Sequence, residues 1–288
     1  MLTQQQLEKH LWGAADILRG RIDSGEYKHY IFGLLFFKRL SDVWREEYEE
    51  RLRRYDGNQD LAVLPDEHRF HIPEGHFWED VRQRTTDIGA ALNAAFHAIE
   101  DANGRLKDVF QDVDFNNKQR FPDEVLEELL QHFDRLRLRH ADVPADLLGA
   151  AYEYLIAKFA DDAGKKGGEF YTPKMVVRLI VQMLRPEEGM SIYDPACGSG
   201  GMLLESAHHL EREGKSARSL QLFGQEMNLN TWAICKMNLF LHDIDDAFIE
   251  RGDTLRDPKH LTPSNTLRTF DRVLANPPFS LKKWGHAA

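Results

Sequence analysis

Apolar residues recur at helical spacing through the first half of the chain. Residues 3–20 place their leucines on one face of a helix, and Thr3 and Gln6 have the spacing of an N-terminal capping box. Segment 27–55 starts apolar and ends charged, so we expect a helix that is buried at its start and solvated at its end. Further helices are expected at 85–104, 122–136 and 145–160. The pattern predicts an all-α domain over residues 1–140.

The periodicity changes after residue 140, where helices alternate with short apolar strands. Helices are predicted at 174–184, 201–213 and 229–243, and strands at 190–194, 220–226, near 247–253 and at 272–278. This alternation implies a parallel sheet with helices on both faces. The predicted fold of residues 141–288 is an α/β Rossmann-like domain, in which ligands bind at the carboxyl ends of the strands.

Each predicted strand has a polar residue at its carboxyl end: Asp194, Glu226, Asp253 and Asn276. A glycine-rich turn, DPACGSGG at 194–201, joins the first of these strands to a helix. Its glycines permit positive φ angles and a close approach of the backbone to a ligand. The spacing is not that of the dinucleotide fingerprint, and glycine turns also serve tight packing. By itself, the turn favours ligand binding only modestly.

Two of the strand-end acids have a specific interpretation and a plainer one. Glu226 is placed to accept hydrogen bonds from both hydroxyls of a ribose, and it would repel a 2′-phosphate. Asp253 is placed to accept from the exocyclic amine of an adenine. The plainer interpretations are a solvated strand-end acid for Glu226 and a turn aspartate before Thr254 for Asp253. For Asp253 alone, the two are about equally supported.

The motif NPPF at 276–279 gives the most specific chemical signal. Two consecutive prolines cannot extend a central strand ladder, and they stiffen the chain. They would hold the side-chain oxygen of Asn276 and the carbonyl of Pro277 as two acceptors for one planar NH₂ group. Phe279 offers a face on which a flat base stacks. An ordinary Pro-Pro loop is the alternative, and it fits poorly after the glycine turn and the two acids.

Composition and charge restrict the possible partners. The 288 residues are 42% hydrophobic and 29% charged, with no apolar run of membrane-spanning length. The formal net charge of −10 is unusual for a protein that grips DNA alone, so if the chain works on nucleic acid, either its positive charge is segregated locally or a partner supplies much of the grip. The only two cysteines, Cys197 and Cys235, form no CxxC pattern, which fits a reducing cytoplasm.

Taken in order, GEFYTP, DPACGSGG, GQEMN, GDTL and NPPF resemble the motifs of S-adenosylmethionine-dependent methyltransferases that modify adenine N6 in DNA. The resemblance is closest to the modification subunit of type I restriction–modification systems, and the helical region resembles the N-terminal domain of that subunit. It covers essentially the whole chain. The implied fold is a Rossmann-like methyltransferase domain after an all-α domain. The implied cofactor is S-adenosylmethionine, with no metal and no covalent enzyme intermediate.

The resemblance also implies roles for individual residues. One segment is expected to close over the cofactor: Glu169, Phe170, Tyr171, Thr172, Pro173 and Lys174. A second group is expected to line the cofactor: Asp194, Gly198, Ser199, Gly200 and Gly201 at its methionine end, Glu226 at the ribose and Asp253 at the adenine. The catalytic group is expected to hold a target adenine that has left the duplex stack: Asn276, Pro277, Pro278 and Phe279.

The implied partners are double-stranded DNA, a specificity subunit, a second modification subunit and, in some systems, a motor–nuclease subunit. The helical domain is expected to serve partner docking and DNA clamping, and no membrane is involved. The chain stops soon after NPPF, so we expect a C-terminally truncated catalytic domain with an incomplete sheet.

Three alternatives remain at this point. A protein-glutamine amide methyltransferase would present a planar amide to the same asparagine–proline pocket, although the N-terminal region and GEFYTP argue against it. A non-catalytic assembly module that binds the specificity subunit would fit the early stop. A nicotinamide dehydrogenase fits least, because the glycine spacing differs and NPPF has no role there.

Overall fold

The computed structural model describes residues 2–19, 21–22, 24–163 and 171–278. The chain separates into two compact units, unit 1 at Met1–Leu155 and unit 2 at Ile156–Ala288. The boundary falls within a helix, α7 (Ala145–Ala163), later in the chain than the change of pattern at residue 140. The functional roles assigned to the domains 1–140 and 141–288 remain predictions.

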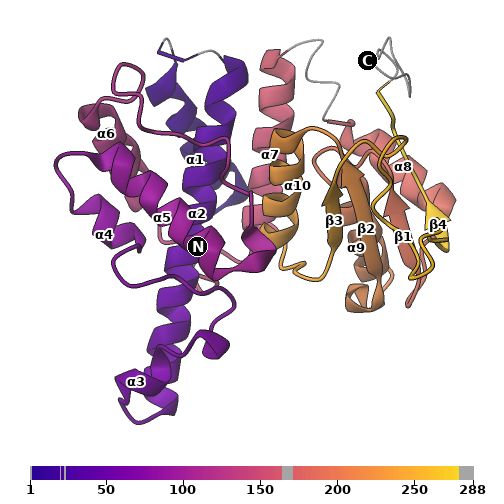
Figure 1. The fold of residues 1–288 in the computed structure, drawn as a ribbon, viewed down its shortest axis with the longest axis horizontal. Helices are drawn as coiled ribbons and strands as arrows, with labels where there is room; N and C mark the ends of the chain where they lie inside the picture. Colours follow the sequence, from indigo (N-terminus) through magenta and orange to yellow (C-terminus); the bar gives the residue numbers. More distant parts are fainter. Residues whose placement is uncertain (1, 20, 23, 164–170, 279–288) are drawn as a thin grey trace. The chain divides into compact units, whose positions relative to one another are not determined.

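Unit 1 is built from helices (Figure 1). Its α-helices before α7 are α1 (Gln4–Leu18), α2 (Ser24–Arg54), α3 (Gln59–Ala62), α4 (Trp78–Arg82), α5 (Ile88–Ala102) and α6 (Asp123–Asp134). Short 3₁₀ turns lie at η1 (Pro65–Glu67) and η2 (Gly104–Leu106). The predicted capping box is confirmed. The side-chain hydroxyl of Thr3 accepts from the backbone N–H of Gln6, and the side chain of Gln6 accepts from the backbone N–H of Thr3.

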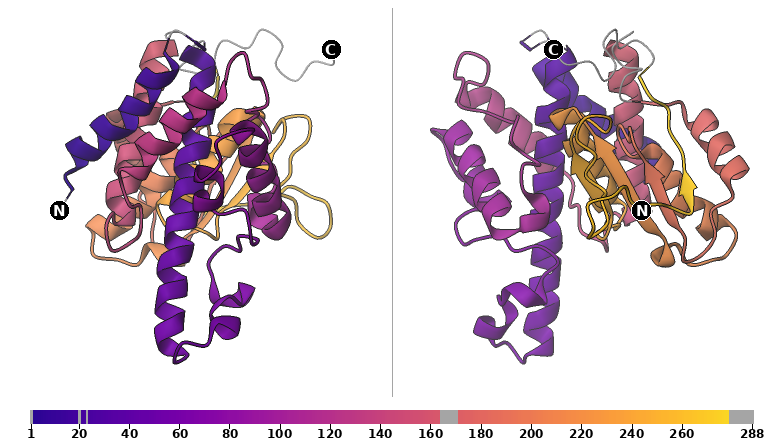
Figure 2. Two further views of the ribbon diagram at one scale, coloured as in Figure 1. Left: turned by 90° about the vertical axis from the view of Figure 1, so that its left-hand side faces the viewer. Right: turned by 45° about the vertical axis from the view of Figure 1, so that its right-hand side comes forward.

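Helix α2 is the central element of unit 1. Its residues 30–43 are buried on every side, whereas residues 44–54 are half-buried or exposed, as the apolar-to-charged pattern predicts. Three of its phenylalanines, Phe32, Phe36 and Phe37, are almost fully buried. The two views of Figure 2 show α2 running through unit 1, with α3 beside its C-terminal part. The hydrophobic core of the unit therefore forms around the first half of this helix.

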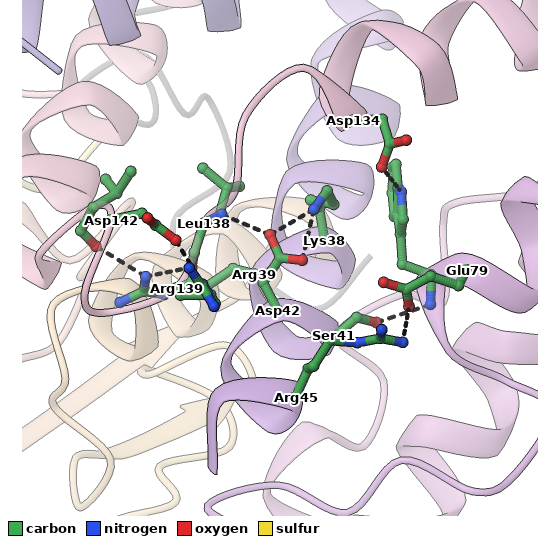
Figure 3. A network of polar contacts seen from close by, with 12 residues as sticks. Lys38, Arg39, Ser41, Asp42, Arg45, Glu79, Asp134, Leu138, Arg139 and Asp142 are labelled. Atoms are coloured by element: carbon green, nitrogen blue, oxygen red, sulfur yellow. Dashed lines mark hydrogen bonds and ion pairs between the residues drawn. The ribbon is translucent and has the colours of Figure 1, made fainter. Parts of the chain in front are cut away.

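A buried polar network ties α2 to the chain that follows α6 (Figure 3). Lys38 Nζ lies 2.6 and 2.5 Å from the two carboxylate oxygens of Asp42, one turn further along the helix. One of those oxygens also accepts from the backbone N–H of Leu138 at 2.6 Å. Arg39 donates to the carbonyls of Leu138 and Val143. These buried charges are thus satisfied by each other and by the backbone.

Unit 2 holds a parallel four-stranded sheet in the order β3-β2-β1-β4 (Figure 1). Its elements after α7 are α8 (Lys174–Leu184), β1 (Ser191–Asp194), α9 (Gly201–Arg212), the 3₁₀ turn η4 (Ala217–Ser219), β2 (Gln221–Glu226), α10 (Leu229–Leu241), β3 (Phe248–Arg251) and β4 (Arg272–Val273). Strands β2 and β3 continue on one side of β1, and β4 lies on its other side. The strand order therefore reverses at β1, which is where ligands bind in open α/β sheets.

The two faces of this sheet are covered differently. On one face, Cys197 packs directly against Gly224, so that a side-chain carbon at Gly224 would lie 3.0 Å from its sulfur. The same sulfur lies 3.9 Å from that of Cys235 on α10. On the other face, the ring of Phe223 packs against His260 and Phe270 from the segment after β3. That segment, residues 252–271, contains no helix. The prediction of helices on both faces is therefore wrong for the part of the chain that the structure describes.

Strand β4 is shorter than the predicted 272–278. The backbone N–H of Leu274 still donates to Tyr193 of β1, but the ladder does not continue to the proline pair. Proline has no N–H to donate, so Pro277 and Pro278 cannot extend it. The chain thus leaves the sheet just before Asn276.

Candidate active site

Asp194 ends β1 and is almost fully buried, with 2% of its surface exposed. Its carboxylate accepts a hydrogen bond from the backbone N–H of Ala196 at 3.0 Å. Burial raises the pKa of Asp194 from 3.8 to about 7, and the negative charge of Glu226 adds to the rise. A carboxylate that is costly to ionise when alone is well placed to pair with a positively charged ligand group.

The glycine turn after β1 depends on backbone angles and on close packing. Gly198 and Gly200 have φ angles of +54° and +80°, in the left-handed region that favours glycine. A side-chain carbon at Gly200 would also lie 2.8 Å from the sulfur of Cys235. Gly200 is the N-cap of α9, and Gly201 is its first residue. The turn therefore brings backbone N–H groups and a helix N-terminus to the carboxyl end of β1.

Glu226 ends β2 and reaches across to this turn. Its two oxygens accept from the backbone N–H groups of Gly198 at 3.1 Å and Asn228 at 2.8 Å. Burial raises the pKa of Glu226, and these backbone hydrogen bonds oppose the rise. A carboxylate has about four acceptor positions, so these backbone bonds do not use its full capacity to accept. The geometry fits the predicted ribose contact while giving Glu226 a structural role as well.

Asp253 lies two residues beyond β3 and holds a turn. One of its oxygens accepts from the backbone N–H groups of Leu255 at 3.0 Å and Arg256 at 3.3 Å, and the other lies 3.6 Å from the Arg256 guanidinium. These contacts match the plainer interpretation of Asp253, a turn aspartate before Thr254. The proposed contact with an adenine remains a prediction. The next residue, Thr254, donates to the carbonyl of Pro195 at 2.5 Å and joins this turn to the end of β1.

Asn276 lies beyond the end of β4, on the side of the sheet where the carboxyl ends of β1 and the other strands lie. Its side-chain nitrogen donates to the hydroxyl of Thr172 at 3.0 Å, across a separation of 104 residues. Among the described residues, no hydrogen bond involves its side-chain oxygen, Oδ1, and Asn276 is half-buried. The oxygen is thus an acceptor for an external donor, as the proposed target-amine contact requires.

The remaining predicted site residues fall into three groups. Some lie near those already described: Ser199, buried in the glycine turn, and Pro277 and Pro278, half-buried after Asn276. Others flank Thr172 at the start of α8: Tyr171, Pro173 and Lys174. Three lie outside the described residues: Glu169, Phe170 and Phe279. Among the described residues, no group of three or more histidine, cysteine, aspartate or glutamate side chains is arranged to hold a metal ion.

The sequence interpretation missed two residues that organise the site. Asn238 of α10 is buried. Its amide donates to the carbonyl of Ser199 at 2.9 Å and so supports the glycine turn. A lone asparagine in the apolar helix WAICKMNLFL was a signal that could have found it. Thr254, which fastens Pro195, directly follows Asp253 and was considered only as part of a turn.

A parallel sheet that reverses order at β1, with a glycine turn after β1 and an acid ending β2, is typical of Rossmann-like nucleotide-binding domains, which include the S-adenosylmethionine-dependent methyltransferases. Residues 143–288 match the N-6 DNA Methylase family, and residues 7–133 match the HsdM N-terminal domain. The chain belongs to the N-6 DNA methylase family.

Its relatives include the type I restriction enzyme MjaIX methylase subunit of Methanocaldococcus jannaschii, 32% identical over 97% of this chain and 52% of that protein. The MpnII methylase subunit of Mycoplasma pneumoniae is 31% identical over 97% of this chain and 59% of that protein. A crystal structure of a type I restriction-modification methyltransferase subunit from Streptococcus thermophilus matches with a TM-score of 0.82 and 31% identity, covering 97% of this chain and 64% of the other. The chain spans about half the length of the curated relatives it matches.

No helix among the described residues is long and apolar enough to cross a membrane.

Proposed function

We propose that this chain carries the cofactor site and the target-base acceptors of a site-specific DNA methyltransferase that modifies adenine at N6. The observation that carries the proposal is the position of Asn276. Asn276 follows β4, which pairs in parallel with β1 just before β1 ends on Asp194, and the amide oxygen of Asn276 has no hydrogen bond among the described residues. An acceptor for a planar amine beside a nucleoside-binding edge is the arrangement that amine methylation needs.

The residues at this edge fit S-adenosylmethionine. Glu226 is placed to accept from the ribose hydroxyls, and the glycine turn lets the backbone approach the ligand. Asp194 is available to pair with positive charge at the methionine end, and Asp253 to meet the adenine. When bound, the cofactor supplies an electrophilic methyl group, so the protein's own task is positioning.

The target adenine would be flipped out of the duplex so that its amine reaches Asn276. The side-chain oxygen of Asn276 and the carbonyl of Pro277 accept the two amine protons. These hydrogen bonds draw the nitrogen toward tetrahedral geometry and make its lone pair available for attack. Pro277 and Pro278 stiffen the backbone that carries the two acceptors, which reduces the reorganisation needed at the moment of reaction.

The net charge of −10 bears on the partners of this function. Nonspecific attraction to phosphate requires clustered positive charge, and this chain carries an excess of acids. We therefore propose that a specificity subunit supplies sequence reading and much of the DNA grip, together with a second modification subunit and, in systems that cleave DNA, a motor–nuclease subunit. The cytoplasm is the compartment in which this function would meet its DNA.

Methyl incorporation tests the proposal. The full-length protein, expressed with its specificity subunit, is incubated with duplex DNA and S-adenosylmethionine labelled in the methyl group, and the DNA is then digested to nucleosides. We expect label in N6-methyladenine. Label in protein glutamine instead would favour the amide-methyltransferase alternative, and S-adenosylmethionine binding without any transfer would favour the assembly-module alternative.

A further inference from the structure

The hydroxyl of Thr172 contacts Asn276 and does not cap the helix that it precedes. A threonine just before a helix ordinarily accepts from a backbone N–H of the first turn. Here Pro173 is the N-cap of α8, and its carbonyl accepts from the N–H groups of Val176 and Val177. The side-chain hydrogen bond of Thr172 is instead the one to the Asn276 amide, at 3.0 Å. The hydroxyl is therefore committed to a residue of the target-base motif.

The position of Thr172 relative to Asn276 is set at both ends of α8. At the far end of the helix, the carbonyl of Leu184 accepts from the guanidinium Nε of Arg272, the first residue of β4, at 2.9 Å. Helix α8 and the segment 272–276 are thus joined by one side-chain hydrogen bond at each end. Thr172 lies two residues before α8, while the prolines after Asn276 fix only the backbone there.

The chemistry of the amide explains why such a partner matters. The nitrogen and oxygen of an asparagine side chain can exchange places by rotation about one bond, and only the oxygen accepts a hydrogen bond. In the exchanged orientation, the Asn276 nitrogen would present its donors to the donors of the target amine. In the observed orientation the hydroxyl of Thr172 accepts from the Asn276 nitrogen, which leaves the Asn276 oxygen for the target amine.

We infer that Thr172 is a positioning residue for methyl transfer, which orients the Asn276 amide so that its oxygen receives the target amine. This inference rests on the function proposed above. It differs from the role in cofactor closure that resemblance implies for Thr172, because it acts through Asn276. The two roles predict different kinetic effects.

The test compares Thr172→Val, which removes the hydroxyl at nearly constant shape, with Thr172→Ser, which keeps it. With the specificity subunit present, Thr172→Val should lower kcat at saturating DNA and cofactor by between about 2-fold and 10-fold, the usual range for one neutral hydrogen bond. The dissociation constant for S-adenosylmethionine, measured by calorimetry, should not change. Thr172→Ser should restore kcat. A Thr172→Val protein with wild-type kcat and weaker cofactor binding would overturn the inference.

A spectroscopic measurement decides the hydrogen bond without any turnover. In protein labelled with ¹⁵N at asparagine, the side-chain signals of Asn276 are assigned by their loss in Asn276→Asp. They should shift in Thr172→Val and return in Thr172→Ser. The buried amide of Asn238, bonded to Ser199, is the internal control for correct folding. Unshifted Asn276 signals in Thr172→Val would refute the inference even if the wild-type protein methylates DNA. Failure of the wild type to methylate would count against the proposed function, and these spectra would still decide the role of Thr172.

Discussion

The carboxylate of Glu226 lies 3.1 Å from the backbone nitrogen of Gly198 and accepts its N–H. This contact joins the end of β2 to the glycine turn after β1, so one acid supports the turn and faces the ligand edge. The same carboxylate binds the N–H of Asn228 at the start of α10. Removing it would loosen the turn and also delete the proposed ribose acceptor.

Glu226→Ala should weaken S-adenosylmethionine binding by about 1–3 kcal/mol, the usual cost of losing hydrogen bonds to a charged acceptor. Calorimetric titration of the folded variant measures this directly. Glu250→Ala is the matched control, because Glu250 is an exposed acid on the neighbouring strand β3. Wild-type affinity in Glu226→Ala, or an equal loss in Glu250→Ala, would remove Glu226 from the site.

Gly200→Ala should destabilise unit 2 more than Gly189→Ala does. Both glycines have nearly the same positive φ, +80° and +81°, so both substitutions incur similar backbone strain. Only at Gly200 would the new carbon meet an atom, the Cys235 sulfur at 2.8 Å, while the space around Gly189 is open. Urea unfolding of the two variants isolates this contact. Combining Gly200→Ala with Cys235→Ala should recover part of the difference, and equal destabilisation of both single variants would contradict the packing assignment.

The raised pKa of Asp194 predicts a stability loss as pH increases. Between an unfolded value near 3.9 and the native value of about 7, the native state holds a proton that the unfolded state has released. The free energy of unfolding must then fall as pH rises through this window, by up to about 1.4 kcal/mol per pH unit. The side chain in Asp194→Asn cannot titrate. The free energy of unfolding of this variant, relative to that of the wild type, should therefore increase from pH 4 to pH 7. Parallel pH profiles for the two proteins would show that Asp194 titrates normally.

Asp271 provides a control of opposite sign for the same experiment. It is exposed and accepts from the backbone N–H of Ser191 at 2.8 Å and from its hydroxyl at 2.7 Å, and these bonds lower the pKa of Asp271. Its stabilising effect is present above its unfolded pKa and is lost as pH falls through the lower native value. Asp271→Asn should therefore be less stable than the wild type at neutral pH and approach it in acid.

In unit 1, Asp42→Ala should be strongly destabilising, by about 3–5 kcal/mol, because it leaves the buried Lys38 ammonium without its carboxylate. The change also removes the acceptor for the N–H of Leu138. Replacing both charges, as in Lys38→Met with Asp42→Leu, should be milder than the single change. Lys118→Ala, which removes an exposed ion pair with Asp87, is the control and should change urea unfolding little. A single Asp42→Ala variant as stable as this control would contradict the assignment of the network.

Local patterns predicted the regular elements of the fold well. Helix α8 spans Lys174–Leu184, as its apolar repeat and the preceding proline indicate, and β1, β2 and α9 lie within one or two residues of their predicted positions. Each of these elements is determined by a short stretch of sequence. The polar residues at the ends of β1 and β2 were identified for the same reason.

Long-range relations could not be read from these patterns. The hydrogen bond between Thr172 and Asn276 depends on how α8 and β4 pack, and neither residue has a periodic signal that indicates the other. The helix-free covering of the Phe223 face was missed because strand–helix alternation gives only the usual form of such sheets. Lys38 and Asp42 have the i, i+4 spacing of any helix ion pair, and only tertiary packing buries them.

The most direct test of the proposed function is methyl transfer by Asn276→Ala, assayed with the specificity subunit, duplex DNA and labelled S-adenosylmethionine. Since Asn276 is proposed to meet the target amine and not the cofactor, cofactor affinity should stay at the wild-type value. Transfer to adenine N6 should fall by about 100-fold or more, the scale seen when one positioned hydrogen-bond partner of a reacting group is removed. An Asn276→Ala protein that still forms N6-methyladenine at a near wild-type rate would contradict the account.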